Sequence, residues 1–227
     1  MDFGIIKKDY ENCEIFFAKE LYFDPIENFH ITPPVSSNPQ TDWIAQSYAL
    51  RCIIEEFPND EYKIVEVGCA HGHGTRQFFN YMEIMKPGKS KVYGIDSKLH
   101  GYCPCMFVDG MEFVDGTSSD VLKQFYDNSL HFVFIDACHC SACTYRDAIN
   151  YSVKVKKGGY IAFHDTSPKF QGGTEQPRTP DCAEDTHIGC VKAIEKWNPC
   201  SNGFEFVLEE IPKKEYWGGV TLFRKIR

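Results

Sequence analysis

The feature that most restricts the fold of this sequence is a regular alternation of short apolar runs with segments of helical periodicity. Five runs rich in β-branched and aromatic residues lie at 64–67, 91–96, 111–115, 131–136 and 160–166. Such runs are typical of strands buried on both faces of a parallel sheet, and the intervening helices form right-handed crossovers. The sequence therefore predicts an α/β fold of the doubly wound type. Ligands of such folds bind outside the carboxyl ends of the strands.

Two further apolar runs, at 204–209 and 219–224, close the chain and are joined by a short link. A link of that length suits an antiparallel pair of strands. Helices are predicted from a cap at Thr41 or Asp42 to residue 57, over 75–85 and 121–125, in the segment that ends at glycines 158 and 159, and from a cap at Asp185 or Thr186 to residue 197.

The length of 227 residues predicts one domain. We expect this domain to span residues 41–227, with residues 1–40 as a cap segment over the sheet and a helix within 11–21. Residues 167–184 contain several glycines and prolines and show no periodicity, so they are predicted to form a lid-like loop.

The composition excludes several classes of protein. A net charge of −8 argues against a nucleic-acid surface, which requires clustered Lys and Arg. No apolar run is long enough to span a membrane, and residues 1–8 lack the apolar core of a signal peptide. We therefore expect a cytoplasmic protein without nucleic-acid or membrane partners. Its eleven cysteines are then expected to be reduced thiols.

The first predicted strand ends in a glycine-rich turn with an acid inside the strand. The order is Glu66-x-Gly68-x-x-x-Gly72-x-Gly74, followed by Thr75 at the start of a helix. A strand, a glycine turn and a helix N-terminus together present backbone N–H groups to a ligand. The spacing differs from the G-x-G-x-x-G of dinucleotide-binding proteins, and the carboxylate favours a cationic amine over a pyrophosphate. By itself, the pattern also fits an ordinary tight turn.

The next strand ends at Asp96, about 20 residues past the glycines, where an acid commonly accepts hydrogen bonds from ribose hydroxyls. The third strand leads into Gly116-Thr117-Ser118-Ser119. For Ser118 or Ser119 the alternative role is simple capping of the following helix. The fourth and fifth strands end in Asp136 and in His164-Asp165.

Together these segments resemble the class I S-adenosylmethionine-dependent methyltransferases, and specifically a small O-methyltransferase-like branch (methyltransferase domain family 24 type). The resemblance covers about residues 41–166. It rests on the glycine turn and on four motifs in order: Ile135-Asp136-Ala137-Cys138-His139, Arg146-Asp147, Lys157-Gly158-Gly159 and His164-Asp165-Thr166. It implies a Rossmann-like, mostly parallel seven-stranded sheet with an antiparallel last strand.

The resemblance also implies the cofactor, S-adenosylmethionine, and the residues that bind it. These are Glu66, Gly68, Cys69, Ala70, Gly72, Gly74, Thr75, Asp96, Ser97, Gly116, Thr117, Ser118 and Asp136. It implies transfer of the methyl group to a hydroxyl of a small molecule of the sugar or natural-product type. It leaves the acceptor itself unspecified, and leaves open whether the chain forms a homo-oligomer.

For catalysis, the resemblance implies His139 as general base, with Asp136 beside it. Some members of this branch bind Mg²⁺ at the ends of the fourth and fifth strands, which points to Asp136, Asp165 and His164 as metal ligands. Carboxylates and water are the ligands that a hard divalent cation prefers. Alternatively, these His and Asp side chains only bond neighbouring loops.

Two other interpretations stay open. In one, the chain binds S-adenosylmethionine without transferring a methyl group, since Cys138 stands where the family often has an acid. In the other, a Cys/His cluster around Cys138, His139 and Cys140 binds zinc or a softer ion, or is redox active; His164 is a further candidate ligand. A nicotinamide dehydrogenase is disfavoured by the glycine spacing.

Overall fold

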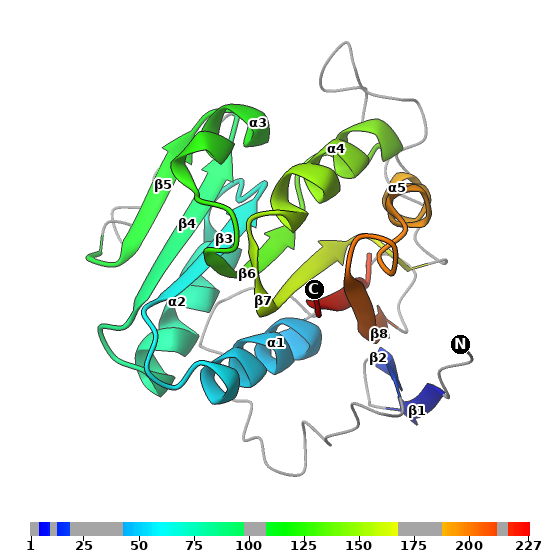
Figure 1. Cartoon of the computed structure of the whole chain (residues 1–227), viewed down its shortest axis with the longest axis horizontal. Coiled ribbons are helices and arrows are strands. Elements are labelled where there is room, and N and C mark those ends of the chain that lie inside the picture. Colours follow the sequence, from blue (N-terminus) through cyan, green and yellow to red (C-terminus); the bar gives the residue numbers. More distant parts are fainter. Residues whose placement is uncertain (1–4, 10–12, 19–42, 98–107, 168–187, 213–217) are drawn as a thin grey trace.

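The computed structural model describes residues 5–9, 13–18, 43–97, 108–167, 188–212 and 218–227. These residues form one sheet of nine strands in the order β1-β2-β8-β9-β7-β6-β3-β4-β5 (Figure 1). The strands are β1 (Ile5–Asp9), β2 (Cys13–Ala18), β3 (Tyr62–Val67), β4 (Ser90–Asp96), β5 (Met111–Asp115), β6 (Leu130–Ile135), β7 (Val155–His164), β8 (Phe204–Pro212) and β9 (Val220–Lys225).

The five strands from β3 to β7 run parallel to one another, and β9 is antiparallel to both β7 and β8. The order of β3 to β9 therefore confirms the predicted doubly wound sheet of seven strands with an antiparallel last strand. Sequence order reverses between β3 and β6, which lie side by side. At such a switch point the crevice outside the carboxyl ends of the strands is the expected ligand site.

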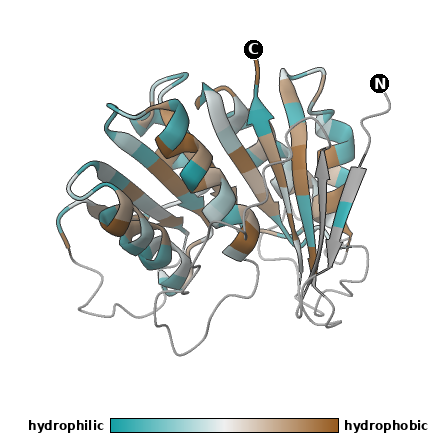
Figure 2. Cartoon of the chain, turned by 90° about the horizontal axis from the view of Figure 1, so that it is seen from below, coloured by the Kyte–Doolittle hydropathy of each residue, from teal (hydrophilic) through white to brown (hydrophobic). Residues whose placement is uncertain are grey.

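Helices cover both faces of this sheet. They are α1 (Trp43–Glu56), α2 (His73–Met85), α3 (Ser118–Val121), α4 (Ser141–Ser152) and α5 (Gly189–Trp197), with a 3₁₀ turn, η3 (Leu122–Gln124), after α3. Strand β6 explains the two layers, because its successive side chains alternate between faces. Phe132 and Phe134 pack with α1 and α2, whereas Val133 and Ile135 pack with α4 and α5. In Figure 2 the helices carry hydrophobic and hydrophilic residues side by side, as helices packed on a sheet must.

The first part of the chain differs from the prediction. Strands β1 and β2 form an antiparallel hairpin, and β2 pairs with β8 and so widens the sheet. The helix predicted over 11–21 is therefore wrong across 13–18. The edge of β8 offers backbone groups to pair with, and such pairing overrides a local helical preference. Residues 1–4, 10–12 and 19–40 of the predicted cap lie outside the described residues.

Two boundaries near the fifth predicted strand also shift. Helix α4 ends at Ser152, and β7 already begins at Val155, so residues 156–159 belong to the strand and not to the end of a helix.

The predicted helix over 121–125 is instead α3 and η3. It is capped at Thr117, whose side chain accepts from Asp120 N–H at 3.2 Å. Residues 168–184 of the predicted lid, and all four predicted caps at 41, 42, 185 and 186, lie outside the described residues. Among the helices described, none has the length and apolarity needed to cross a membrane.

Candidate functional site

The turn between β3 and α2 passes directly against the end of β6. Gly68 has a φ of +92°, and a Cβ built there would lie 2.2 Å from the carbonyl oxygen of Asp136. Gly68 N–H donates to the carbonyl of Ile95 at 2.7 Å. Only glycine fits this left-handed position and this close approach, which explains why the turn begins with it.

Glu66 lies beneath this turn. It is 2 % exposed, and its carboxylate accepts a hydrogen bond from the Thr75 hydroxyl. A Cβ at Gly74 would lie 2.1 Å from Glu66 Oε1, so the absence of a side chain there makes room for the carboxylate. Glu66 thus holds the first turn of α2 against β3. Its predicted contact with the cofactor stays a prediction.

A cavity of about 260 Å³ opens at the carboxyl ends of β3, β4, β5 and β6. Its lining comes from these strand ends and from the start of α4: Val67, Gly68, Ile95, Asp96, Ser97, Gly116, Thr117, Ser118, Ser119, Ala137, Cys138, Cys143, Arg146 and Asp147. The alternation of strands and helices predicted a ligand site at this edge.

Six residues predicted to bind the cofactor line this cavity: Gly68, Asp96, Ser97, Gly116, Thr117 and Ser118. Cys69, Ala70, Gly72, Gly74 and Thr75 form the adjoining turn and helix start instead. Among them, Ala70 N–H donates to Asp96 Oδ2 at 2.8 Å, which fixes the carboxylate at the mouth of the turn. Gly72 is the N-cap of α2, with a φ of +75°.

Arg146 and Asp147 of α4 also line the cavity, which the sequence did not predict. Ser118 Oγ donates to Asp147 Oδ1 at 2.5 Å, which ties the start of α3 to α4. Asp147 is 3 % exposed, and burial raises the pKa of its carboxyl to about 6. The Arg-Asp pair in the family-like motif was the available signal, but helical spacing alone does not tell which face of α4 meets the cavity.

Beside the cavity, two aspartates and two histidines gather at the ends of β6 and β7. His139 Nδ1 lies 3.0 Å from Asp165 Oδ2, and its Nε2 lies 3.5 Å from Asp136 Oδ1. His164 Nδ1 lies 3.1 Å from a carboxylate oxygen of each aspartate. All four residues predicted for catalysis or metal binding are therefore in one cluster, which we call the Asp–His cluster.

The charges of this cluster stabilise one another. Burial acts to raise the pKa of Asp136, but the imidazoles of His164 and His139 outweigh it and hold that pKa below its usual range. Burial acts to lower the pKa of His139, yet the carboxylates of Asp136 and Asp165 outweigh it and raise that pKa. Both ring nitrogens of His139 face a carboxylate, which favours the imidazolium form.

The cluster could also hold a metal ion. Ligand atoms of Asp136, His139 and Asp165 lie within 4.8 Å of one another, and His164 adjoins two of them. Two carboxylates and an imidazole suit a divalent cation. The arrangement includes the predicted Asp136 and Asp165 and adds His139, which the sequence predicted as a base and, in the alternative Cys/His site, as a ligand of a softer ion.

Comparison with known proteins agrees with the fold. Residues 65–166 match the family model Methyltransf_24, described as a methyltransferase domain. The fold resembles an O-methyltransferase from Bacillus cereus in complex with SAH (TM-score 0.53, 13 % identity, covering 86 % of this chain and 84 % of that one). It also resembles the O-methyltransferase NovP (TM-score 0.54, 13 % identity, 81 % of each chain). No curated protein sequence matches the chain.

Proposed function

We propose that the protein uses S-adenosylmethionine to methylate a hydroxyl group of a small molecule, because residues 65–166 match the model of a methyltransferase domain. The observation that carries this proposal is the junction of two sites. The cavity at the ends of β3 to β6 is walled by Ala137 and Cys138, and these residues connect Asp136 to His139 in the Asp–His cluster.

The lining of the cavity suits this cofactor. The Asp96 carboxylate is an acceptor for the two ribose hydroxyls, and Gly68 contributes to the lining beside it. Ser118, Ser119 and Asp147 supply polar atoms at the far wall, below the end of β5. This wall is the place that we assign to the adenine.

When bound, S-adenosylmethionine supplies a methyl group on a positively charged sulfur. The acceptor oxygen must approach that carbon in line, so the protein's task is to place the hydroxyl and take its proton. We assign His139 as the base: its imidazole, when unprotonated, accepts the proton of the hydroxyl. Asp165 and Asp136 then stabilise the imidazolium that forms. With the cofactor bound, the acceptor oxygen would take its methyl group and the neutral thioether would leave.

A divalent cation on Asp136 and Asp165 would assist this step. Such an ion lowers the pKa of a bound hydroxyl and orients its oxygen. His139 lies within reach of both carboxylates, so ion and imidazolium would compete for them. We therefore include Mg²⁺ in the tests as an activator.

The first test is calorimetric titration of S-adenosylmethionine, with and without Mg²⁺, into the wild type, Asp96→Ala and Asp115→Ala. Asp115 is exposed, ends the neighbouring strand β5 and is absent from the cavity lining, so it is the matched control. We expect binding to the wild type and the control and weaker binding to Asp96→Ala. An absence of binding heat in every condition would refute the proposal.

A second test separates the enzyme from a module that binds the cofactor without methyl transfer. The protein is incubated with S-adenosylmethionine and a panel of hydroxylated small molecules, and S-adenosylhomocysteine is measured. Formation of S-adenosylhomocysteine that is lost when His139 is substituted supports the methyltransferase. Binding with no product from any acceptor supports the module.

A further inference from the structure

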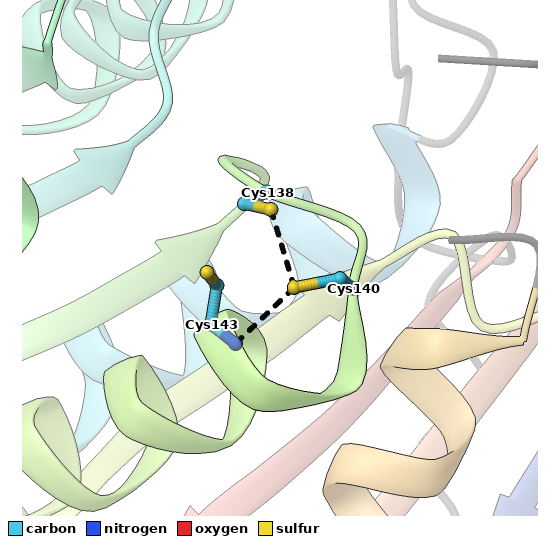
Figure 3. Close-up of side chains that lie close together, drawn as sticks. All are labelled: Cys138, Cys140 and Cys143. Carbon is cyan, nitrogen blue, oxygen red and sulfur yellow. Dashed lines mark hydrogen bonds between the residues drawn. The ribbon is translucent and has the colours of Figure 1, made fainter. Parts of the chain in front are cut away.

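Three cysteines lie together where β6 gives way to α4. The sulfur atoms of Cys138, Cys140 and Cys143 are within 4.8 Å of one another, and those of Cys138 and Cys140 are 3.5 Å apart (Figure 3). Cys140 and Cys143 are buried, whereas Cys138 is partly exposed. We call these residues the thiol cluster.

The surrounding backbone holds this cluster in place. Cys140 is the N-cap of α4, and its sulfur accepts from Cys143 N–H at 3.4 Å. The Thr144 hydroxyl donates to the carbonyl of Cys138 at 2.7 Å. From the other side, Gly189 of α5 packs so closely that a Cβ there would lie 2.0 Å from the carbonyl oxygen of His139. The backbone of this turn is therefore positioned by contacts that need no ligand.

We propose that Cys138, Cys140 and Cys143 bind a thiophilic d¹⁰ cation, Zn²⁺ or Cu⁺, as a site separate from the Asp–His cluster. Soft thiolates select such ions over the hard cations that carboxylates prefer. Sulfur atoms bound to a tetrahedral ion with bonds of about 2.3 Å are about 3.8 Å apart, close to the separation of Cys138 and Cys140.

The charges fit an ion bound by three thiolates. Binding forms three metal–sulfur bonds and releases three thiol protons, so a Zn²⁺ site carries a net charge of −1. Arg146 Nη2 lies 3.2 Å from Cys143 Sγ and supplies the compensating positive charge. Because the thiols must lose their protons to bind the ion, the affinity should increase with pH.

The position of the cluster links it to the cavity. Cys138 and Cys143 both line the cavity, so an ion held by the three sulfurs would lie at the cavity wall and keep a fourth position for another ligand. An open fourth position is the arrangement of ions that take up water or a ligand. The ion would also brace the turn that forms one wall of the cavity.

The test uses the full chain, purified under reducing conditions and freed of metal. Co²⁺ is titrated first, because thiolate-to-cobalt charge transfer reports sulfur ligands specifically; Zn²⁺ then competes, and Cu⁺ is measured against a chromogenic chelator in a separate arm. The variants are Cys140→Ser and Cys138→Ser. Serine is itself a good N-cap, so Cys140→Ser keeps the start of α4. The exposed Cys200→Ser is the matched control.

We expect the charge-transfer band in the wild type, in Cys200→Ser and in Asp165→Asn, which alters only the Asp–His cluster. Loss of one thiolate should weaken ion binding by more than about 100-fold, since even outer partners of a metal ligand contribute 10–100-fold. An unchanged band in Cys138→Ser and Cys140→Ser, or no binding of any of the three ions, would overturn the inference. Titration of S-adenosylmethionine is a separate measurement, so a chain that binds the cofactor but no ion refutes this inference alone.

Discussion

Glu66 carries a carboxyl group that water barely reaches. Burial raises its pKa from 4.5 to about 8, so the folded protein keeps a proton that the unfolded chain releases. The free energy of unfolding should therefore fall as the pH rises from 4.5 to 8. Glu66→Gln, which imitates the protonated acid and can still accept from Thr75, should remove that part of the slope. Urea unfolding at a series of pH values measures it, with the exposed Glu112→Gln as control. An equal slope in Glu66→Gln would contradict the assignment.

His139 should set the acidic limb of the pH profile. Asp136 and Asp165 raise its pKa, His164 opposes them, and only the deprotonated imidazole can accept a proton. Activity should thus increase with pH through a value above the usual 6.5 of histidine. Asp165→Asn removes one of the charges that raise the pKa, so the limb should move to lower pH. The stability from the raised pKa runs the opposite way: it is present below about 6.5 and is lost as the pH rises through the folded-state value.

Profiles of kcat/KM for the wild type and Asp165→Asn measure this limb. Asparagine tolerates the left-handed backbone of position 165, where φ is +57°, so the variant should fold. A limb that stays in place, with activity merely reduced, would indicate that Asp165 does not act through the His139 charge. Repeating the profiles with Mg²⁺ shows whether an ion takes over the role of the proton.

At the scale of elements, the turn from β3 to α2 should tolerate no side chain at its first glycine. Gly68→Ala combines a left-handed φ with the contact to Asp136, so we expect a cost of about 2–5 kcal/mol in unfolding free energy. Gly88→Ala is the matched control, because its φ is +65° but nothing lies within 4 Å of the added Cβ. It should cost about 1–2 kcal/mol. Equal urea midpoints for the two variants would refute the close-approach argument.

The sequence predicted best those helices and strands that a local residue pattern determines, and missed those that depend on pairing with distant residues. Strands such as β4 and β6 are continuous apolar runs that end in an acid, so their places were predicted within a residue or two. Strand β2 was missed, because its pairing with β8 joins residues nearly 200 positions apart and leaves no local pattern. The start of β7 was missed for a related reason: residues 156–159 resemble the end of a helix, and only the pairing with β6, which shifts register there, shows that they are a strand.

At the scale of the whole molecule, the site was predictable because topology brings strand ends together. Asp96, Asp136 and Asp165 are predictable as acids at strand ends, and the parallel pairing of β4, β3, β6 and β7 brings those ends to one edge of the sheet. The directions of helical side chains were not predictable. Asp147 meets Ser118 only because α4 presents that face to α3, and the thiol cluster forms only because the turn before α4 folds Cys138 back onto Cys140.

The cavity itself gives the last prediction, because it exists only in the folded sheet. Its lining comes from four strand ends and from α4, and no local segment could reproduce it in the unfolded chain. A ligand that binds the folded state alone stabilises it by RT ln(1 + [L]/Kd), about 2.7 kcal/mol at 100 times Kd. For a chain of this size that corresponds to about 5–10 °C in Tm. We expect this shift with S-adenosylmethionine and S-adenosylhomocysteine, a smaller one in Asp96→Ala, and none with methionine, which lacks the ribose and adenine. A shift with methionine as large as that with S-adenosylmethionine would place the ligand elsewhere than along the ends of β3 to β6.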